Sequence, residues 1–104
     1  MNVIILPLAR IQAICIANYI YENWGQKSAE KFGKQYVKCR KILSGNPTIG
    51  ALEHLLIHRP EKYRYIMINN KNKIIYRIQD NNIYIVDIWD TRMNPETLIG
   101  RVGK

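Results

Sequence analysis

Hydrophobic and polar positions change their period several times along the chain, and each change marks the edge of an expected element. Residues 2–6 form a short apolar run of β-branched character that Pro7 closes, which predicts a buried strand. From Pro7 onward the apolar positions follow a helical period, and Gly25 suits the residue just after a helix end. A helix is therefore predicted over residues 8–24. Its apolar stripe consists of Ala13, Ala17, Ile20 and Trp24.

A second helix carries the clearest periodicity in the chain, with an apolar stripe on one side and lysines on the other. It follows Gly25 almost at once and ends near Ser44, so the two helices are expected to form an antiparallel hairpin. The apolar stripe consists of Ala29, Phe32, Tyr36, Cys39 and Leu43. The opposite stripe, which is expected to be exposed, consists of Lys27, Lys31, Lys34, Lys38 and Lys41.

Three alternating segments in the second half of the chain predict an antiparallel meander. The expected strands are 63–68, 73–79 and 83–90, joined by turns rich in Asn and Asp. Residues 45–62 are expected to form a loop with at most a short helix. The order β-α-α-β-β-β predicts one α+β domain over residues 1–104, with the helical hairpin packed on one face of a small, mainly antiparallel sheet.

The charge of the chain indicates a negatively charged partner but does not identify the function. Sixteen Lys and Arg residues against eight Asp and Glu residues give a net charge of +8. So large a positive charge predicts attraction to polyanions or to an acidic protein, without choosing between nucleic acid, protein and membrane surface. Pro7 and Arg10 interrupt the apolar N-terminal run, so no membrane-spanning segment is expected. A cytoplasmic location is expected, with Cys15 and Cys39 as buried thiols.

Metal and cofactor chemistry has little support in the sequence. His54 and His58 are four residues apart, but the nearest acidic residues are only Glu53 and Glu61, so exposed loop histidines are expected rather than a metal site. The chain has no Gly-rich phosphate loop, no nucleophile elbow and no cysteine pairs at zinc spacing. We therefore expect neither a metal nor a cofactor.

Basic residues on the predicted strands are the most interesting candidates for function. Lys73 and Arg77 lie on the strand face opposite its apolar positions, so they are expected to reach an open face of the sheet, where Arg64 and Arg92 can converge with them. Such cations hold phosphates, and Tyr65 offers a stacking surface for an unpaired base. The alternative is an ordinary solvated sheet face. The positions expected to face the core are Ile74, Tyr76 and Ile78.

Three stretches of the chain resemble one known family. They are "ANYIYENWGQKSAEKF" (17–32), "NPTIG" (46–50) and "YRYIMINNKNKIIYRIQDNNIYIVDIWDTRMNP" (63–95). Together with the order of elements, they resemble the RelE/ParE superfamily, the toxins of bacterial type II toxin–antitoxin pairs. The resemblance implies a growth inhibitor that a cognate antitoxin neutralises. It also implies that residues 96–104 form a short extension after the last strand, and Leu98 and Ile99 are expected to pack back on the sheet.

The resemblance implies different site residues in the two branches of the superfamily. In the ribosome-dependent mRNA-cleaving branch, Arg64 and Lys73 match catalytic strand positions and Arg92 matches a basic position after the last strand. Arg77 and Tyr65 are then candidate contacts to the RNA or to another target. The ParE branch needs no catalytic residues, because it acts by binding DNA gyrase.

Departures from the ribonuclease pattern favour the ParE branch. Ile66 stands where a second lysine is expected, Met93 follows the last basic position, and Leu98 and Ile99 stand where some members carry a tyrosine. We therefore expect gyrase binding. The alternatives are a ribosome-dependent mRNA endoribonuclease and a non-toxic, basic nucleic-acid-binding module.

An antitoxin is the partner implied in both branches, as part of a toxin–antitoxin hetero-oligomer. Its acidic side chains are expected to meet the positive charge of the chain, since charge complementarity speeds association. Lys31, Lys34 and Lys38 on the second helix are the candidate contacts. The alternative is that these lysines only keep the protein soluble.

Overall fold

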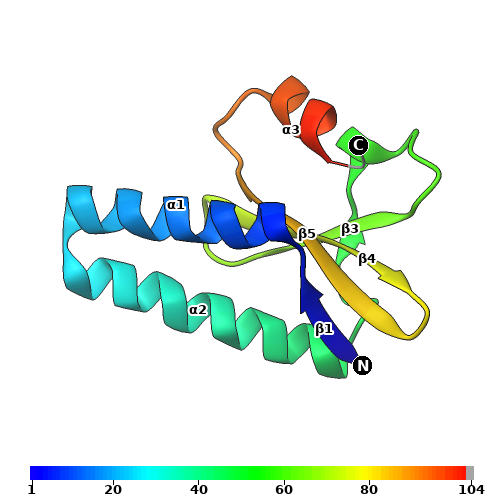
Figure 1. The fold of residues 1–104 in the computed structure, drawn as a ribbon, viewed down its shortest axis with the longest axis horizontal. Helices are drawn as coiled ribbons and strands as arrows, with labels where there is room; N and C mark the ends of the chain where they lie inside the picture. Colours follow the sequence, from blue (N-terminus) through cyan, green and yellow to red (C-terminus); the bar gives the residue numbers. More distant parts are fainter. Residues whose placement is uncertain (103–104) are drawn as a thin grey trace.

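The computed structural model describes residues 1–102. It shows a five-stranded mixed sheet with a long helical hairpin on one face (Figure 1). The strand order is β1-β5-β4-β3-β2, with β1 parallel to β5 and the other neighbours antiparallel. The predicted α+β class and the C-terminal meander are confirmed. The elements are β1 (Asn2–Ile5), α1 (Pro7–Trp24), α2 (Gln26–Gly45), β2 (Ala51–Leu52), the 3-10 helix η1 (His54–Leu56), β3 (Tyr63–Met67), β4 (Asn72–Gln79), β5 (Asn82–Asp90) and α3 (Pro95–Arg101).

The predicted hairpin turns on a single residue between the two long helices. Gly25 has a φ of 89°, a conformation that favours glycine, and it caps both the end of α1 and the start of α2. Its amide donates to the Tyr21 carbonyl at 2.9 Å, and its carbonyl accepts from the Ala29 amide at 3.2 Å. The helices therefore run back along each other with no intervening loop.

Strand β5 carries an irregularity that its sequence pattern alone does not reveal. Ile75 of β4 pairs with Asp87, whereas Tyr76 pairs with Ile85, so Val86 is an extra residue in a β-bulge. Val86 and Asp87 therefore lie on the same face, and Ile88 returns to the opposite one, where it packs with Ile85 beneath the hairpin.

The helix-facing core agrees with the prediction for β4. Ile74 and Tyr76 are fully buried, and Ile78 packs against the same cluster. On the hairpin the cluster takes its large side chains from α2, including Phe32 and Leu43, because α1 supplies mostly alanine and isoleucine there. The period-2 alternation of β4 is therefore read correctly from its sequence.

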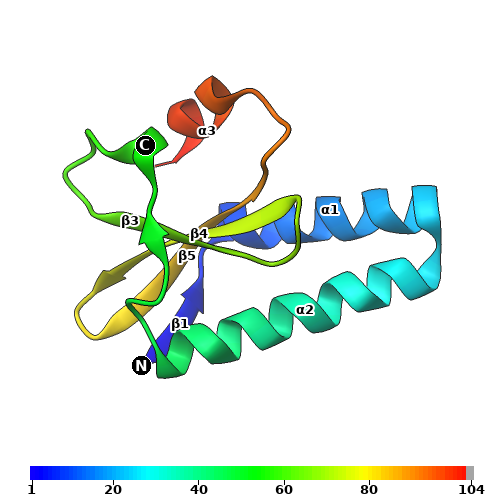
Figure 2. The ribbon, with the colours of Figure 1, turned by 180° about the vertical axis from the view of Figure 1, so that it is seen from behind.

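The other face of the sheet is not open, and that prediction is wrong. Ile75 is completely buried there, in a second core with Trp89, Leu98 and Val102. The cover consists of η1 and α3, which lie side by side over the strands (Figure 2). Residues 96–104 are expected to form a short extension. Residues 103 and 104 lie outside the described residues, and most of the remainder folds into α3 instead.

Of several smaller predictions, some are confirmed and others are wrong. The packing of Leu98 on the sheet is confirmed, but Ile99 is 38% exposed. Cys39 is buried as predicted, whereas Cys15 is exposed, so the prediction for Cys15 is wrong. The segment expected to be a loop contains β2 as well as η1. The lysine stripe of α2 and both histidines are exposed, as expected. None of the helices within residues 1–102 combines the length and hydropathy needed to span a bilayer.

Candidate interaction cleft

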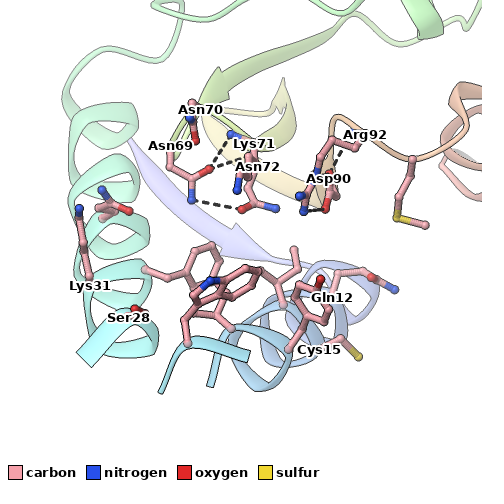
Figure 3. Close-up of a pocket in the computed structure, with 17 residues that line it drawn as sticks. Gln12, Cys15, Ser28, Lys31, Asn69, Asn70, Lys71, Asn72, Asp90 and Arg92 are labelled. Carbon is pink, nitrogen blue, oxygen red and sulfur yellow. Dashed lines mark hydrogen bonds and ion pairs between the residues drawn. The ribbon is translucent and has the colours of Figure 1, made fainter. Parts of the chain in front are cut away.

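An open cleft of about 620 Å³ lies between the turn of the helical hairpin, the β3–β4 turn and the end of β5 (Figure 3). We call it the interaction cleft. Helix α1 contributes Tyr19 and Trp24, α2 contributes Lys31, and the strand side contributes Lys71, Asp90 and Arg92. Segments far apart in the sequence therefore meet in one concave surface.

The hairpin wall of the cleft is aromatic. Trp24 is 56% exposed, although its helical spacing predicted a buried position. The Tyr19 and Trp24 rings meet edge to face, with 5.7 Å between centroids, and the Lys71 ammonium lies 5.8 Å from the Trp24 centroid. The hairpin runs past the edge of the sheet (Figure 1), so the last turn of α1 has no strand beneath it. A large apolar ring is thus left facing the cleft beside a cation.

The strand wall of the cleft is held in place by side-chain hydrogen bonds. The Asn69 side-chain oxygen accepts from the amides of Lys71 and Asn72, both at 2.8 Å, and its nitrogen donates to the Asn72 side chain at 3.2 Å. The Lys71 carbonyl accepts from the Thr91 amide at 2.8 Å and from its hydroxyl at 3.0 Å. These bonds, some of them visible in Figure 3, fix the turn against the end of β5.

The rim of the cleft is positive. Arg92 forms a two-pronged ion pair with Asp90, with nitrogen–oxygen distances of 3.0 and 2.7 Å. Hydrogen bonding from Arg92 lowers the pKa of Asp90, and the carboxylate in turn raises the pKa of Arg92. Among the described lining residues, the charged side chains are three cations, Lys31, Lys71 and Arg92, and one carboxylate, Asp90. An acidic segment that also presents an apolar side chain is the ligand that matches such a surface.

Arg64 does not join the other predicted catalytic cations. It pairs in register with Tyr76, so it lies on the helix-facing side of β3. Its guanidinium donates to the Gly50 carbonyl at 2.8 Å and to the Thr48 carbonyl at 3.5 Å. Arg64 thus closes the segment before β2 onto the sheet.

Lys73 lies on the opposite face and is largely buried. Its ammonium is 2.5 Å from the Glu53 carboxylate, with the two side chains 11% and 4% exposed. The same ammonium lies 4.6 Å from the centroid of the Tyr65 ring. Two of the predicted site residues, Lys73 and Tyr65, are therefore brought together, but in an internal contact.

The remaining predicted cations lie elsewhere again. Arg77 stacks over the Tyr84 ring at 4.6 Å and donates to Gln79. Arg92 alone of the predicted strand cations reaches the interaction cleft. The expected convergence of Arg64 and Arg92 with the β4 cations is therefore not seen.

The predicted antitoxin contacts are partly placed at the cleft. Lys31, Lys34 and Lys38 are all exposed on α2, but of these only Lys31 lines the cleft. Sequence reasoning missed Trp24 and Lys71 as site residues. The turn motif around Lys71 was visible in the sequence, whereas the exposure of Trp24 depends on where the sheet ends.

Comparison with known proteins agrees with this fold. Residues 3–95 match the family of ParE toxins of the type II toxin–antitoxin system parDE. The chain is similar to a solved structure of the chromosomal ParDE toxin–antitoxin system from P. aeruginosa, with a TM-score of 0.71 and 19% identity over 86% of this chain and 95% of that one. It is also similar to the YoeB dimer from Staphylococcus aureus, with a TM-score of 0.55 and 23% identity over 84% and 92% of the two chains.

Among curated proteins, none matches the chain. The family match spans nearly all of it, and the two structural likenesses support the same fold. The chain therefore belongs to the ParE toxin family, within the RelE/ParE superfamily of type II toxins.

Proposed function

We propose that this toxin inhibits growth by binding DNA gyrase and not by cutting mRNA. One observation carries the proposal: each cation that a ribonuclease mechanism would use is engaged within the protein. Arg64 holds backbone carbonyls, Lys73 is paired with buried Glu53, and Arg92 is paired with Asp90. Arg64 lies on β3 and Lys73 on β4, whereas Arg92 follows the end of β5.

Phosphodiester cleavage needs donors that converge on one phosphate, since the developing charge must be stabilised from close range. Arg64 and Lys73 point to opposite faces of neighbouring strands and do not meet this requirement. Both histidines, the most common general bases, lie near η1 rather than in the interaction cleft. A toxin that acts by occupying a surface of its target needs none of this chemistry.

The interaction cleft and the lysines of α2 support an acidic antitoxin as partner. The chain carries a net charge of +8, and the cleft offers exposed Trp24 beside Lys71 and Lys31. An antitoxin segment with one apolar anchor and flanking carboxylates would fill the cleft and reach Lys34 and Lys38. Aromatic side chains that become buried in an interface, as Trp24 would here, commonly dominate the binding energy.

The ribonuclease alternative retains one supporting observation. Arg92 is 52% exposed at the rim of a cleft that holds two aromatic rings, an arrangement that can stack an unpaired base. Primer extension on an mRNA translated in vitro separates the two functions. We expect no new 5′ ends when the purified protein is added.

A matched pair of variants makes that experiment decisive. New 5′ ends at ribosome-occupied codons that vanish with Arg92→Ala, but persist with the exposed control Lys62→Ala, would establish the ribonuclease instead. Expression of the chain without its antitoxin should also arrest growth. Unimpaired growth together with salt-sensitive binding to any nucleic acid would indicate the non-toxic binding module.

A further inference from the structure

Tyr36 of α2 is nine-tenths buried, yet its hydroxyl group has no hydrogen-bond partner within residues 1–102. The ring itself is well packed, since it stacks on Phe32 with 6.3 Å between centroids. The guanidinium carbon of Arg40 lies 4.6 Å from the Tyr36 centroid, and the buried Nε of Arg40 also has no acceptor. Buried donors are rarely left unpaired, so two of them together indicate that an acceptor from another molecule belongs here.

A second arginine approaches the same place from α1. Gly25 turns the hairpin, and Arg10 and Arg40 lie at equal distances along the chain on either side of it, which places both about 22 Å from the turn. Arg10 lies on the same stripe of α1 as Ala17, which packs in the core, and its charge acts to lower the pKa of Tyr36, so Arg10 lies near α2. We call Arg10, Tyr36 and Arg40 the seam cluster. The two long helices lie side by side along this seam in Figure 1.

Electrostatics at the seam cluster are uncompensated. The ion pairs within residues 1–102 involve Lys73, Arg92 and Arg101, and neither arginine of the cluster. Burial raises the pKa of Tyr36, although the charges of Arg40 and Arg10 act to lower it. The hydroxyl is therefore a neutral donor beside two like charges. A carboxylate placed beside the Tyr36 hydroxyl would be attracted by both positive charges.

The surroundings of the seam cluster identify the class of anion. Ile14 and Tyr21 follow Arg10 along the same stripe of α1, and Val37 precedes Arg40 on α2, with all three apolar side chains exposed. The only charged residues of α1 are Arg10 and Glu22. A nucleic acid would need a row of cations for successive phosphates. An amphipathic protein segment would instead match one carboxylate to the arginines and its apolar side chains to this strip.

We propose that the seam cluster is a carboxylate-binding site that takes one Asp or Glu side chain from an amphipathic acidic segment of the antitoxin. The Arg40 guanidinium swings off the Tyr36 ring to meet the carboxylate, which uncovers the hydroxyl as a further donor. Arg10 completes the site from α1. The inference rests on the proposed function for the identity of the partner, but the site itself can be tested without any antitoxin.

The first test uses acetate as the probe on the full-length, isotope-labelled chain, at constant ionic strength. We expect acetate to produce saturable NMR shifts at the Arg40 Nε and the Tyr36 ring. These shifts should be lost in Arg40→Gln and Tyr36→Phe and retained in Lys38→Gln, a matched exposed cation on the same helix. Absence of a saturable shift would overturn the proposal. A second result would also overturn it: inorganic phosphate binds the seam cluster more tightly than acetate does, and a single-stranded oligonucleotide displaces the phosphate. That result would identify the ligand as nucleic acid.

Thermal melting shows that the variants still fold. Tyr36→Phe keeps the packed ring and removes only an unpaired hydroxyl, and Arg40→Gln removes one of the two positive charges beside it. Both free variants should therefore melt at or above the wild-type Tm, with unchanged NMR spectra away from the seam. A loss of Tm in both would mean that these groups have partners within the protein, and would contradict the proposal.

The second test measures neutralisation by the antitoxin that co-purifies from the native operon. Arg40→Gln should weaken its binding by at least about tenfold, as loss of a buried charged partner does, while growth arrest by the free toxin is unchanged. Equal affinity for wild type and variant would overturn the site and leave the proposed function intact. If the chain does not arrest growth at all, the proposed function fails, and the acetate experiment still decides the site.

Discussion

The ammonium group of Lys73 on β4 lies 2.5 Å from the carboxylate of Glu53, which caps η1 through the Leu55 amide. One carboxylate thereby joins a central strand to the short helix that covers it. A lysine whose position resembles that of a catalytic residue is thus a structural link in this protein. The contrast explains why its matching position is a weak argument for ribonuclease activity.

Breaking this pair should destabilise the fold strongly. Lys73→Met leaves the Glu53 carboxylate buried without a partner, and we expect a loss of about 3–5 kcal/mol in the free energy of unfolding. Urea denaturation measures it, with the exposed Lys62→Met as control, expected to change stability by less than about 0.5 kcal/mol. A loss below about 1 kcal/mol for Lys73→Met would show that the pair is not structural.

Gly50 should not tolerate a side chain. A Cβ at this position would meet the Tyr76 hydroxyl at 2.5 Å and the Tyr65 carbonyl at 2.6 Å, and the Gly50 amide already donates to that hydroxyl. Gly50→Ala should therefore cost about 1–3 kcal/mol. Gly33→Ala is the matched control: its Cβ meets nothing within 4 Å, and in a helix it should stabilise by about 1 kcal/mol. Equal denaturation midpoints for the two variants would contradict the clash.

The ion pair of Asp87 and Arg101 should attach α3 to the sheet in a pH-dependent manner. Asp87 is fully buried, and Arg101 contacts it at 2.7 and 2.9 Å. Burial raises the pKa of Asp87, and Arg101 acts to lower it. Arg101→Leu should thus raise that pKa further. When the pKa of Asp87 is higher in the folded state than in the unfolded state, the free energy of unfolding falls as the pH rises from the unfolded-state pKa to the folded-state pKa.

The pH profile of Arg101→Leu tests this sign. We expect a destabilisation of about 3–5 kcal/mol at neutral pH, where a lone carboxylate would be buried, and a smaller one in acid, where Asp87 is protonated. Denaturation curves of both proteins across this range give the difference. A destabilisation that grows in acid would have the wrong sign and would contradict this role of Asp87.

Trp24 should be an anchor for the antitoxin without being needed for folding. Its ring is more than half exposed in the interaction cleft, so Trp24→Ala should barely change the Tm but should weaken antitoxin binding by about 2 kcal/mol or more. Isothermal titration calorimetry with the co-purified antitoxin measures the loss. Ile57→Ala, at a similarly exposed residue outside the cleft, is the control. Similar losses for both variants would exclude Trp24 as an anchor.

Local signals in the sequence were sufficient for the hairpin and the meander, because each depends on residues that are neighbours in the chain. Gly25 marks the helix turn, and Asp80 and Asn81, with φ values of 52° and 64°, suit the β4–β5 turn. Helix α3 also carries local signals: the Asn94 side chain accepts from the Glu96 amide at 3.0 Å, and Pro95 follows it. Those signals predict a helix at Pro95, in contrast to the short extension expected for residues 96–104.

The candidate site could not be predicted in the same way, since it depends on contacts distant in sequence. Alternation places Lys73 and Arg77 on the correct strand face, yet nothing near them reveals that η1 and α3 cover it. Helical spacing puts Trp24 on the apolar stripe of α1, but it does not reveal that this residue lies beyond the edge of the sheet. The unpaired hydroxyl of Tyr36 likewise becomes visible only when every neighbouring side chain is placed.

The measurement that tests the central claim most directly is supercoiling of relaxed plasmid DNA by purified DNA gyrase, with increasing amounts of this protein. The account predicts inhibition that depends on toxin concentration, persists with Arg92→Ala and is reversed by the antitoxin. Full gyrase activity at toxin concentrations that arrest growth would contradict it.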